Sequence, residues 1–378
     1  MIEYIHTCIS VLNLVMMSKI IAVFVCCVLC ILVCCTTEDI NIKMGGNETV
    51  TFPALIVFGD SIVDTGSNND LITEAKCNFL PYGRDFLGGK PTGRFSNGRV
   101  PPDFIAEELG IKDLIPSYRS SDLQSNDLLT GVSFASGASG YDPLTPQLQC
   151  LQSVIPLSDQ LKQFKEYIEK LKGNFGEERT KFILSKSLVL VVASNNDIGI
   201  SYFATRIRQV QYDIGSYTDM LVHFASTFIK DIYGLGARRI GVFDAAPLGC
   251  VPFERTLFGD EERKCSQEIN SASQLFNIKL STQIDHLNQN LPQANVVYVD
   301  IYNPLLHIIE NPIKYGFEVV DKGCCGTGTI ELGTLCNQLQ PTCIDDSKHV
   351  FWDAFHPTEK TYQILVRDLL NKTLHKFF

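Results

Sequence analysis

Four short segments of the chain carry residue types suited to nucleophilic catalysis, and the first contains a serine. Ser61 follows the apolar run of residues 54–59, with only Asp60 between them. A serine just beyond a buried strand can present its hydroxyl at the sheet edge as a nucleophile. The alternative is a helix N-cap, a role that Asp60 or Ser61 would also suit. The Gly-x-Ser-x-Gly motif of the α/β-hydrolases is absent from the chain.

Two further segments are rich in small or amide-bearing residues. Residues 132–140 consist mainly of serine, alanine and glycine, and such small residues let a backbone approach a ligand closely. Residues 194–197 follow the apolar run 187–193 and contain two asparagines. An asparagine side chain at a strand end can donate a hydrogen bond to a developing oxyanion. Each segment is also compatible with an ordinary turn.

The fourth segment pairs an acid with a histidine near the C-terminus. Asp353 precedes His356 by three residues, and a carboxylate at this spacing can bond one ring nitrogen and leave the other free as a general base. The alternative is a surface histidine beside Pro357. Together the four segments supply a nucleophile, a base, an orienting acid and oxyanion donors. This combination is much less frequent by chance than any one of its members.

The pattern of apolar residues predicts the elements that position these segments. Continuous apolar runs, typical of parallel strands covered on both faces, occupy residues 54–59, 187–193, 240–243 and 295–299. Helical spacing predicts three helices, at residues 157–171 with Ser158 as N-cap, at 217–233 ending at Gly234, and at 265–291. Strand–helix alternation of this kind indicates an α/β/α sandwich, in which ligands bind beyond the carboxyl ends of the strands.

Composition limits the class of protein. The 378 residues are 45% hydrophobic, far more than a disordered chain carries. With 32 Lys and Arg against 42 Asp and Glu, the formal net charge of −10 argues against a nucleic-acid partner.

An apolar run near the N-terminus predicts export. Residues 20–35 are apolar, Lys19 precedes them and a polar stretch follows at 36–39. We therefore expect a signal peptide over residues 1–36, cleaved near 35–37, and a secreted, extracellular domain over 37–378 without a stable membrane anchor. Because the run is short for a bilayer span, a signal anchor is the less favoured alternative. The chain could also start at Met17, shortly before this run.

The cysteines and sequons agree with export. Six of the 14 cysteines lie in the leader, and the even number that remains predicts disulfides, with Cys250–Cys265 as first choice because one short loop separates them. A zinc site is the alternative for the cluster Cys324, Cys325, Cys336 and Cys343, but its spacing does not match a zinc knuckle and no histidine stands at ligand spacing. Sequons predict N-glycosylation at Asn47 and Asn371.

Taken as a set, these motifs resemble those of the plant GDSL esterase/lipases of the SGNH hydrolase superfamily. The matching blocks are residues 58–66, 93–99, 131–140, 194–197, 236–250 and 353–357. Residues 141–145 look most like the extracellular-lipase subgroup of anthers and pollen coats. The resemblance covers nearly the whole chain after residue 52.

The resemblance implies a flavodoxin-like, three-layer fold with a central, mostly parallel sheet, and neither metal nor cofactor. It implies that Ser61 is the nucleophile, His356 the general base and Asp353 the partner that orients the base. It also implies an oxyanion hole made by the Ser61 N–H, the Gly137 N–H and the Asn196 side chain.

The chain departs from the family pattern in three places. Ser194 and Ala138 stand where the family usually has glycine, and the asparagine-rich run after Gly66 reads Ser-Asn-Asn-Asp at residues 67–70. None of these changes removes a catalytic atom. The implied function is a secreted serine esterase/lipase that hydrolyses carboxylic esters of lipids, cell-wall polymers or small molecules through an acyl-enzyme on Ser61. An acyltransferase is a variant of this chemistry. A non-catalytic lipid- or wall-binding protein on the same fold is the alternative from another class.

Overall fold

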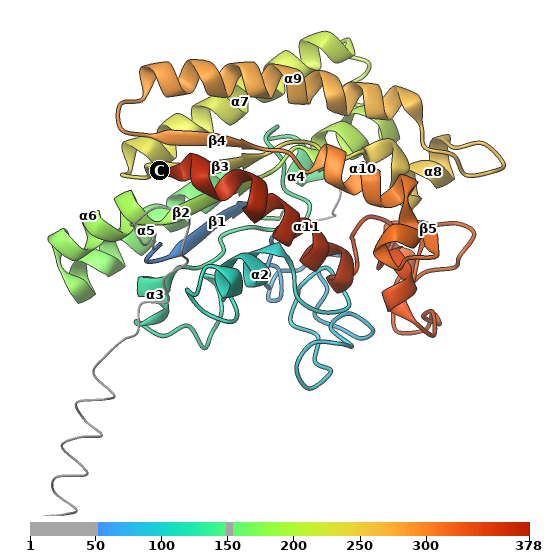
Figure 1. Cartoon of the computed structure of the whole chain (residues 1–378), viewed down its shortest axis with the longest axis horizontal. Helices are drawn as coiled ribbons and strands as arrows, with labels where there is room; N and C mark the ends of the chain where they lie inside the picture. The colour runs from blue at the N-terminus through green and yellow to red at the C-terminus, as the bar shows by residue number, and fades with distance from the viewer. Residues whose placement is uncertain (1–51, 149–153) are drawn as a thin grey trace, which may run out of the picture. The chain divides into compact units, whose positions relative to one another are not determined.

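A four-stranded parallel sheet lies at the centre of the computed structural model, which describes residues 52–148 and 154–378 (Figure 1). Its strands follow chain order: β1 (Leu55–Gly59), β2 (Leu188–Val192), β3 (Arg239–Phe243) and β4 (Asn295–Val299). All four predicted strands are confirmed. The predicted leader, Asn47 and Cys150 lie outside the described residues.

A short extended segment continues the sheet beyond β1. Residue Val57 of β1 forms a parallel bridge with Ser133, and the Phe134 N–H donates to the Val57 carbonyl at 2.8 Å. The second predicted site segment is therefore bonded along the strand that precedes Ser61. Hydrogen bonding fixes the two segments side by side, although no run of apolar residues long enough to predict a strand occurs there.

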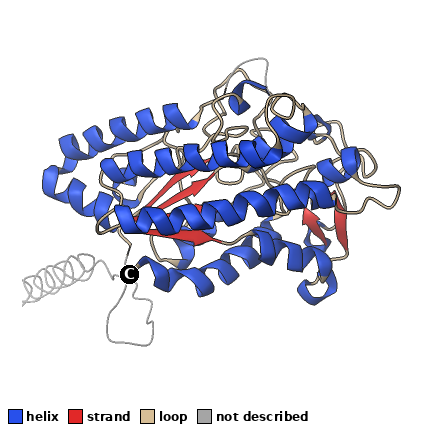
Figure 2. Cartoon of the chain, turned by 90° about the horizontal axis from the view of Figure 1, so that it is seen from above, coloured by secondary structure: helices blue, strands red, loops and turns tan. Residues whose placement is uncertain are grey.

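Helices cover both faces of the sheet, as Figure 2 shows. On one face α5 (Leu157–Phe175), α7 (Ile214–Gly234) and α9 (Gln267–Asn290) enclose the larger core with residues such as Phe58, Phe164 and Phe276. On the other face α2 (Pro101–Glu108) contacts β1 and α11 (Glu359–Thr373) contacts β4. This arrangement confirms the predicted three-layer α/β/α sandwich.

The ends of the predicted helices differ in one instructive place. The prediction of Ser158 as N-cap of α5 is wrong: the helix begins at Leu157, and Pro156 occupies the cap position. The Pro156 carbonyl accepts the Gln160 N–H at 3.0 Å, so the helical bonds start two residues earlier than Ser158 would allow. At α7 and α9 the side chains of Asp213 and Ser266 cap the first turn.

The remaining elements are short and lie mainly around the sheet edges. They are α3 (Asp127–Thr130), α4 (Thr145–Leu148), α6 (Glu177–Lys186), the π-helix η1 (Asp197–Ala204), α8 (Pro252–Phe258), α10 (Tyr302–Glu310), and the parallel pair β5 (Val319–Gly323) and β6 (His349–Phe351), with 3-10 turns at Leu248–Cys250, Pro312–Tyr315, Gly333–Leu335, Asp346–Lys348 and Leu374–Phe377. Among the described residues, no helix is long and apolar enough to cross a membrane.

Three disulfides cross-link residues in the described part of the chain. Cys250–Cys265 forms as predicted. The four clustered cysteines form Cys324–Cys343 and Cys325–Cys336, which decides between the two readings of the cluster in favour of disulfides. Cys77 is buried and forms no disulfide with any described residue.

Candidate active site

A tight turn places Ser61 at the carboxyl end of β1. The Asp60 N–H donates to the Val192 carbonyl of β2 at 2.9 Å, and Asp60 Oδ1 accepts the Ile62 N–H at 3.0 Å. Gly59 precedes the turn with a φ of +145°, and a Cβ there would collide with the Val192 carbonyl. No helix begins at Asp60 or Ser61, so the N-cap alternative is wrong for both residues.

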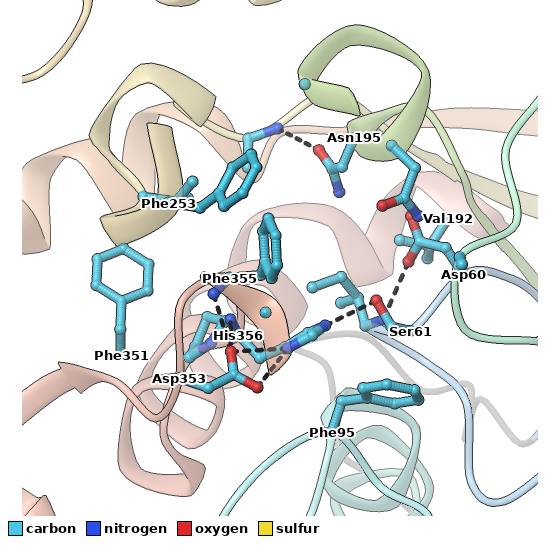
Figure 3. A pocket seen from close by; sticks show the side chains of 18 of the residues that line it. Asp60, Ser61, Phe95, Val192, Asn195, Phe253, Phe351, Asp353, Phe355 and His356 are labelled. Atoms are coloured by element: carbon cyan, nitrogen blue, oxygen red, sulfur yellow. Dashed lines mark hydrogen bonds and ion pairs between the residues drawn. The ribbon is translucent and has the colours of Figure 1, made fainter. Parts of the chain in front are cut away.

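His356 lies within hydrogen-bonding distance of both Ser61 and Asp353 (Figure 3). His356 Nε2 is 2.8 Å from Ser61 Oγ, and His356 Nδ1 is 2.9 Å from each carboxylate oxygen of Asp353. All three residues are buried. Asp353 and His356 are three positions apart in the sequence, and the fold brings the histidine to a serine that lies 295 positions before it.

Several donors converge on the Asp353 carboxylate. Its Oδ1 accepts the backbone N–H groups of Phe355 and His356, each at 2.8 Å, and its Oδ2 accepts the Tyr82 hydroxyl at 2.7 Å. Burial alone would raise the pKa of Asp353, but His356 and these hydrogen bonds outweigh it and hold the pKa below its usual value. The carboxylate therefore stays ionised and can orient the imidazole.

Tyr82 is a site residue that sequence reasoning missed. It lies 271 positions before Asp353, in a loop without helical or strand periodicity, so no local spacing links the two residues. The same loop supplies Phe95, whose ring centroid is 5.0 Å from that of His356. This loop and the C-terminal segment thus enclose the histidine from two sides.

A buried carboxylate binds the backbone of the second segment. The Gly137 N–H donates to Asp64 Oδ2 at 2.8 Å, while Asp64 Oδ1 accepts the N–H groups of Gly66 and Ser67. The Gly137 N–H is therefore engaged by the buried Asp64 carboxylate, and the role of Gly137 as an oxyanion donor stays a prediction. Ala138, the next residue, lines the active-site cavity with a φ of +67°, a left-handed conformation that favours glycine.

Two other backbone amides at the site remain available. Among the described residues, neither the Ser61 N–H nor the Ala138 N–H has a hydrogen-bond partner. Both residues line the same cavity. The Gly137 N–H is bonded to Asp64, and the chain turns in a left-handed conformation at Ala138. The Ala138 N–H is therefore the candidate oxyanion donor in this segment.

The third segment is tied to the second by side chains. Asn196 Nδ2 donates one hydrogen bond to the Ser139 carbonyl at 2.9 Å, and an amide nitrogen carries a second N–H. The neighbouring Asp197 accepts the Tyr141 N–H at 2.8 Å and the Thr145 hydroxyl at 2.6 Å. Burial raises the pKa of Asp197 to about 8. These bonds fix the segment that carries Asn196, which lines the same cavity as Ser61.

The triad opens into a largely apolar cavity of about 680 Å³. Its walls include aromatic and aliphatic side chains from both sides of the sheet, among them Phe79, Phe243, Leu248, Phe253, Phe355 and Leu369. Figure 3 shows Phe253 and Phe355 on the opposite side of His356 from Phe95. A cavity of this size falls in the range of about 300–1,000 Å³ that small-molecule sites occupy.

Comparison with known proteins agrees with this geometry. A family model for the GDSL-like lipase/acylhydrolase domain matches residues 55–369. The Arabidopsis thaliana protein GDSL esterase/lipase At3g14820 is 56% identical over 327 residues, which make up 86% of this chain and 91% of that protein. GDSL esterase/lipase EXL3 from the same plant is 54% identical over 326 residues, 86% of this chain and 88% of its own length. The chain therefore belongs to the family of GDSL-like lipases and acylhydrolases.

Proposed function

We propose that this protein is a serine hydrolase of carboxylic esters. The observation that carries the proposal is the 2.8 Å contact between Ser61 Oγ and His356 Nε2, with Asp353 on the other ring nitrogen. This is the arrangement in which an imidazole can take the serine proton during attack on an acyl carbon. The names of the Arabidopsis relatives, which call them esterase/lipases, support the same chemistry.

The reaction runs in two halves. Ser61 Oγ bonds to the acyl carbon while His356 Nε2 takes the hydroxyl proton, and the resulting tetrahedral intermediate expels the alcohol, which receives that proton from His356. Water then attacks the acyl-enzyme with His356 again acting as base, and the carboxylic acid and free Ser61 are released. Asp353 holds the imidazole orientation and stabilises its charged form throughout.

The negative oxygen of each intermediate needs donors at the strand ends. We assign this role to the Ser61 N–H, the Ala138 N–H and the second N–H of the Asn196 side chain. Removal of one such donor costs about 10²–10³ in kcat in other serine hydrolases.

The cavity supports an apolar acyl chain as the group that is transferred to Ser61. Its lining of phenylalanine and leucine side chains would be covered by a lipid-like chain, which gains about 25 cal/mol for each Å² of apolar surface removed from water. The likeness of residues 141–145 to the anther and pollen-coat subgroup stays a prediction, and so does glycosylation at Asn371, whose side chain is exposed at the end of α11.

Secretion is part of the proposal. The three disulfides support it because such bonds persist in oxidising compartments. N-terminal sequencing of protein recovered from the culture medium tests it. We expect a first residue near 36, whereas a membrane-bound product that keeps residues 20–35 would contradict it.

Hydrolysis of a panel of p-nitrophenyl esters of increasing chain length, alongside acetylated xylan, tests the esterase proposal. We expect turnover that Ser61→Ala abolishes while its circular dichroism spectrum stays that of the wild type. If the wild type hydrolyses none of these esters, the alternative of a binding protein is favoured. Acyl transfer to an added alcohol in preference to water would identify the acyltransferase variant.

A further inference from the structure

A buried acid outside the triad lines the same cavity. Glu254 lies in the first turn of α8, directly after Pro252 and Phe253, and only 2% of its surface is exposed. The triad chemistry does not use this residue. Glu254 is therefore a buried acidic residue in the wall of a cavity whose lining is otherwise largely apolar.

The Glu254 carboxyl group has no partner in the described part of the chain. Its Oε2 atom makes no hydrogen bond there, and no ion pair forms with Glu254. The two arginines that follow Glu254 most closely in the chain are bonded elsewhere. Arg255 donates to the carbonyls of Cys250 and Arg263, and Arg263 donates to those of Thr329 and Asp321.

The carboxyl group reaches the element that carries the oxyanion side chain. A Cβ added to Gly199 in η1 would lie 2.7 Å from Glu254 Oε1, so this glycine leaves the space that the carboxyl group occupies. Gly199 follows Asn196 by three residues. Glu254 thus lies against the same turn of chain that positions Asn196.

Burial decides the protonation state of this acid. No nearby cation compensates, and burial raises the pKa of Glu254 to about 8. At neutral pH the group is mainly a carboxylic acid, with one O–H donor and one carbonyl acceptor. A buried polar group of this kind is stabilised when a partner supplies the missing hydrogen bonds.

We propose that Glu254 is a polar subsite of the ester cavity, which selects substrates whose chain carries a hydroxyl group at a distance from the reacting ester. A hydroxyl suits the site because it can accept the O–H of the acid and donate to its carbonyl oxygen. An unsubstituted alkyl chain would cover the same walls and leave the acid without a partner. This inference rests on the proposed esterase function.

The test compares matched substrates within each enzyme. The probes are p-nitrophenyl esters of one chain length, either unsubstituted or with a hydroxyl at successive positions, and the readout is the ratio of their kcat/KM values. In the wild type we expect a ratio of about ten at the best hydroxyl position, the scale of one buried hydrogen bond. Glu254→Met should bring the ratio to about one, while Glu254→Gln should keep most of it because an amide also donates and accepts.

Glu74 supplies the matched control. It lines the same cavity but is exposed to solvent, so Glu74→Met should leave the ratio unchanged. Circular dichroism checks the fold of each variant. A ratio near one in the wild type at every hydroxyl position, or an equal ratio in wild type and Glu254→Met, overturns the inference. A preference for choline esters that Glu254→Gln abolishes overturns it too, because it would show that the acid binds a cation.

A binding measurement separates this inference from the esterase proposal. Dissociation constants of Ser61→Ala protein are measured by calorimetry for methyl esters of the same hydroxylated and unsubstituted acids. Tighter binding of the hydroxylated ester, lost in the Ser61→Ala, Glu254→Met double variant, supports the subsite even if the wild type turns over no ester. If the Ser61→Ala protein and the double variant bind the hydroxylated ester with equal affinity, the subsite is overturned. The esterase proposal is not affected by that result.

Discussion

Asp353 illustrates how the triad depends on a residue that is distant in sequence. The Tyr82 hydroxyl donates to Asp353 Oδ2 at 2.7 Å, and Tyr82 itself packs edge-on against Trp352. Tyr82 also lines the cavity, but its hydroxyl is donated to the Asp353 carboxylate. We therefore propose that it acts through this carboxylate, which would orient His356, as a positioning residue.

Tyr82→Phe tests this role at the scale of one hydrogen bond. Loss of a buried hydrogen bond costs about 1 kcal/mol, so kcat should fall roughly three- to tenfold while KM stays unchanged. Steady-state kinetics on one ester measure both constants. Tyr82→Leu, which also removes the ring, should lose more. A rise in KM with constant kcat in Tyr82→Phe would show that the hydroxyl contacts substrate instead.

Ala138 carries backbone strain that a glycine at this position would avoid. Its φ of +67° costs a residue with a Cβ about 1–2 kcal/mol, against the smaller entropic cost of glycine. Ala138→Gly should therefore raise the melting temperature by roughly 1–3 °C. Ala135→Gly in the same segment, where φ is not positive, should lower it. A lower melting temperature in Ala138→Gly would contradict this account of the turn.

At the scale of elements, two disulfides support the segment that carries the acid and the base. The N–H groups of Cys324 and Cys325 donate to the carbonyls of Phe351 and Trp352, at 3.0 and 2.6 Å. The disulfides join these cysteines to Cys343 and Cys336. The cross-linked loop thus fixes the backbone immediately before Asp353.

Removal of the Cys325–Cys336 disulfide should therefore affect both stability and activity. We expect the Cys325→Ala, Cys336→Ala variant to lose about 2–4 kcal/mol of unfolding free energy and to show a lower kcat. Removing Cys250–Cys265, which bonds to no part of the triad segment, should cost a similar free energy with a smaller loss of kcat. Urea unfolding and ester kinetics measure the two effects. Equal kcat losses in both variants would contradict the specific support of Asp353.

The strands and helices also show which parts of the fold and of the site could be predicted from the sequence. The four strands were predicted because each is a continuous apolar run, a signal that burial on both faces produces directly. The prediction of Ser158 as N-cap was wrong because the helical hydrogen bonds begin at the Pro156 carbonyl. The hydrogen bond from the Gly137 N–H to Asp64 could not be predicted, because no local spacing links the two residues. Tyr82 and Glu254 gave no signal, since their roles arise only from contacts between distant segments.

At the scale of the whole molecule, the buried acids make the stability of the fold depend on pH. Burial raises the pKa of Asp60 and Asp244 to about 7, of Asp64 to about 6, and of Asp197 and Glu254 to about 8. In the unfolded chain these groups return to values near 4. Between about pH 4 and 8 these five groups therefore bind more protons in the folded protein than in the unfolded chain.

Stability should consequently fall as the pH rises. Because these folded-state pKa values lie above the unfolded ones, their stabilising contribution is complete below about pH 4 and is lost as the pH passes 6 to 8. The melting temperature should decrease from pH 5 to pH 8, and Glu254→Gln should reduce that decrease. Differential scanning calorimetry across this range measures both. A melting temperature that increases from pH 5 to pH 8 would contradict the protonated state of the buried acids.

Covalent labelling with a fluorophosphonate tests the central claim, that Ser61 is a nucleophile activated by His356. The reagent reacts with an activated serine and not with an ordinary exposed hydroxyl. Peptide mapping by mass spectrometry should locate one label per chain, on Ser61, in the wild type, and almost none in a folded His356→Ala variant. A label on another residue, or equal labelling of Ser61 in the two proteins, would contradict the account.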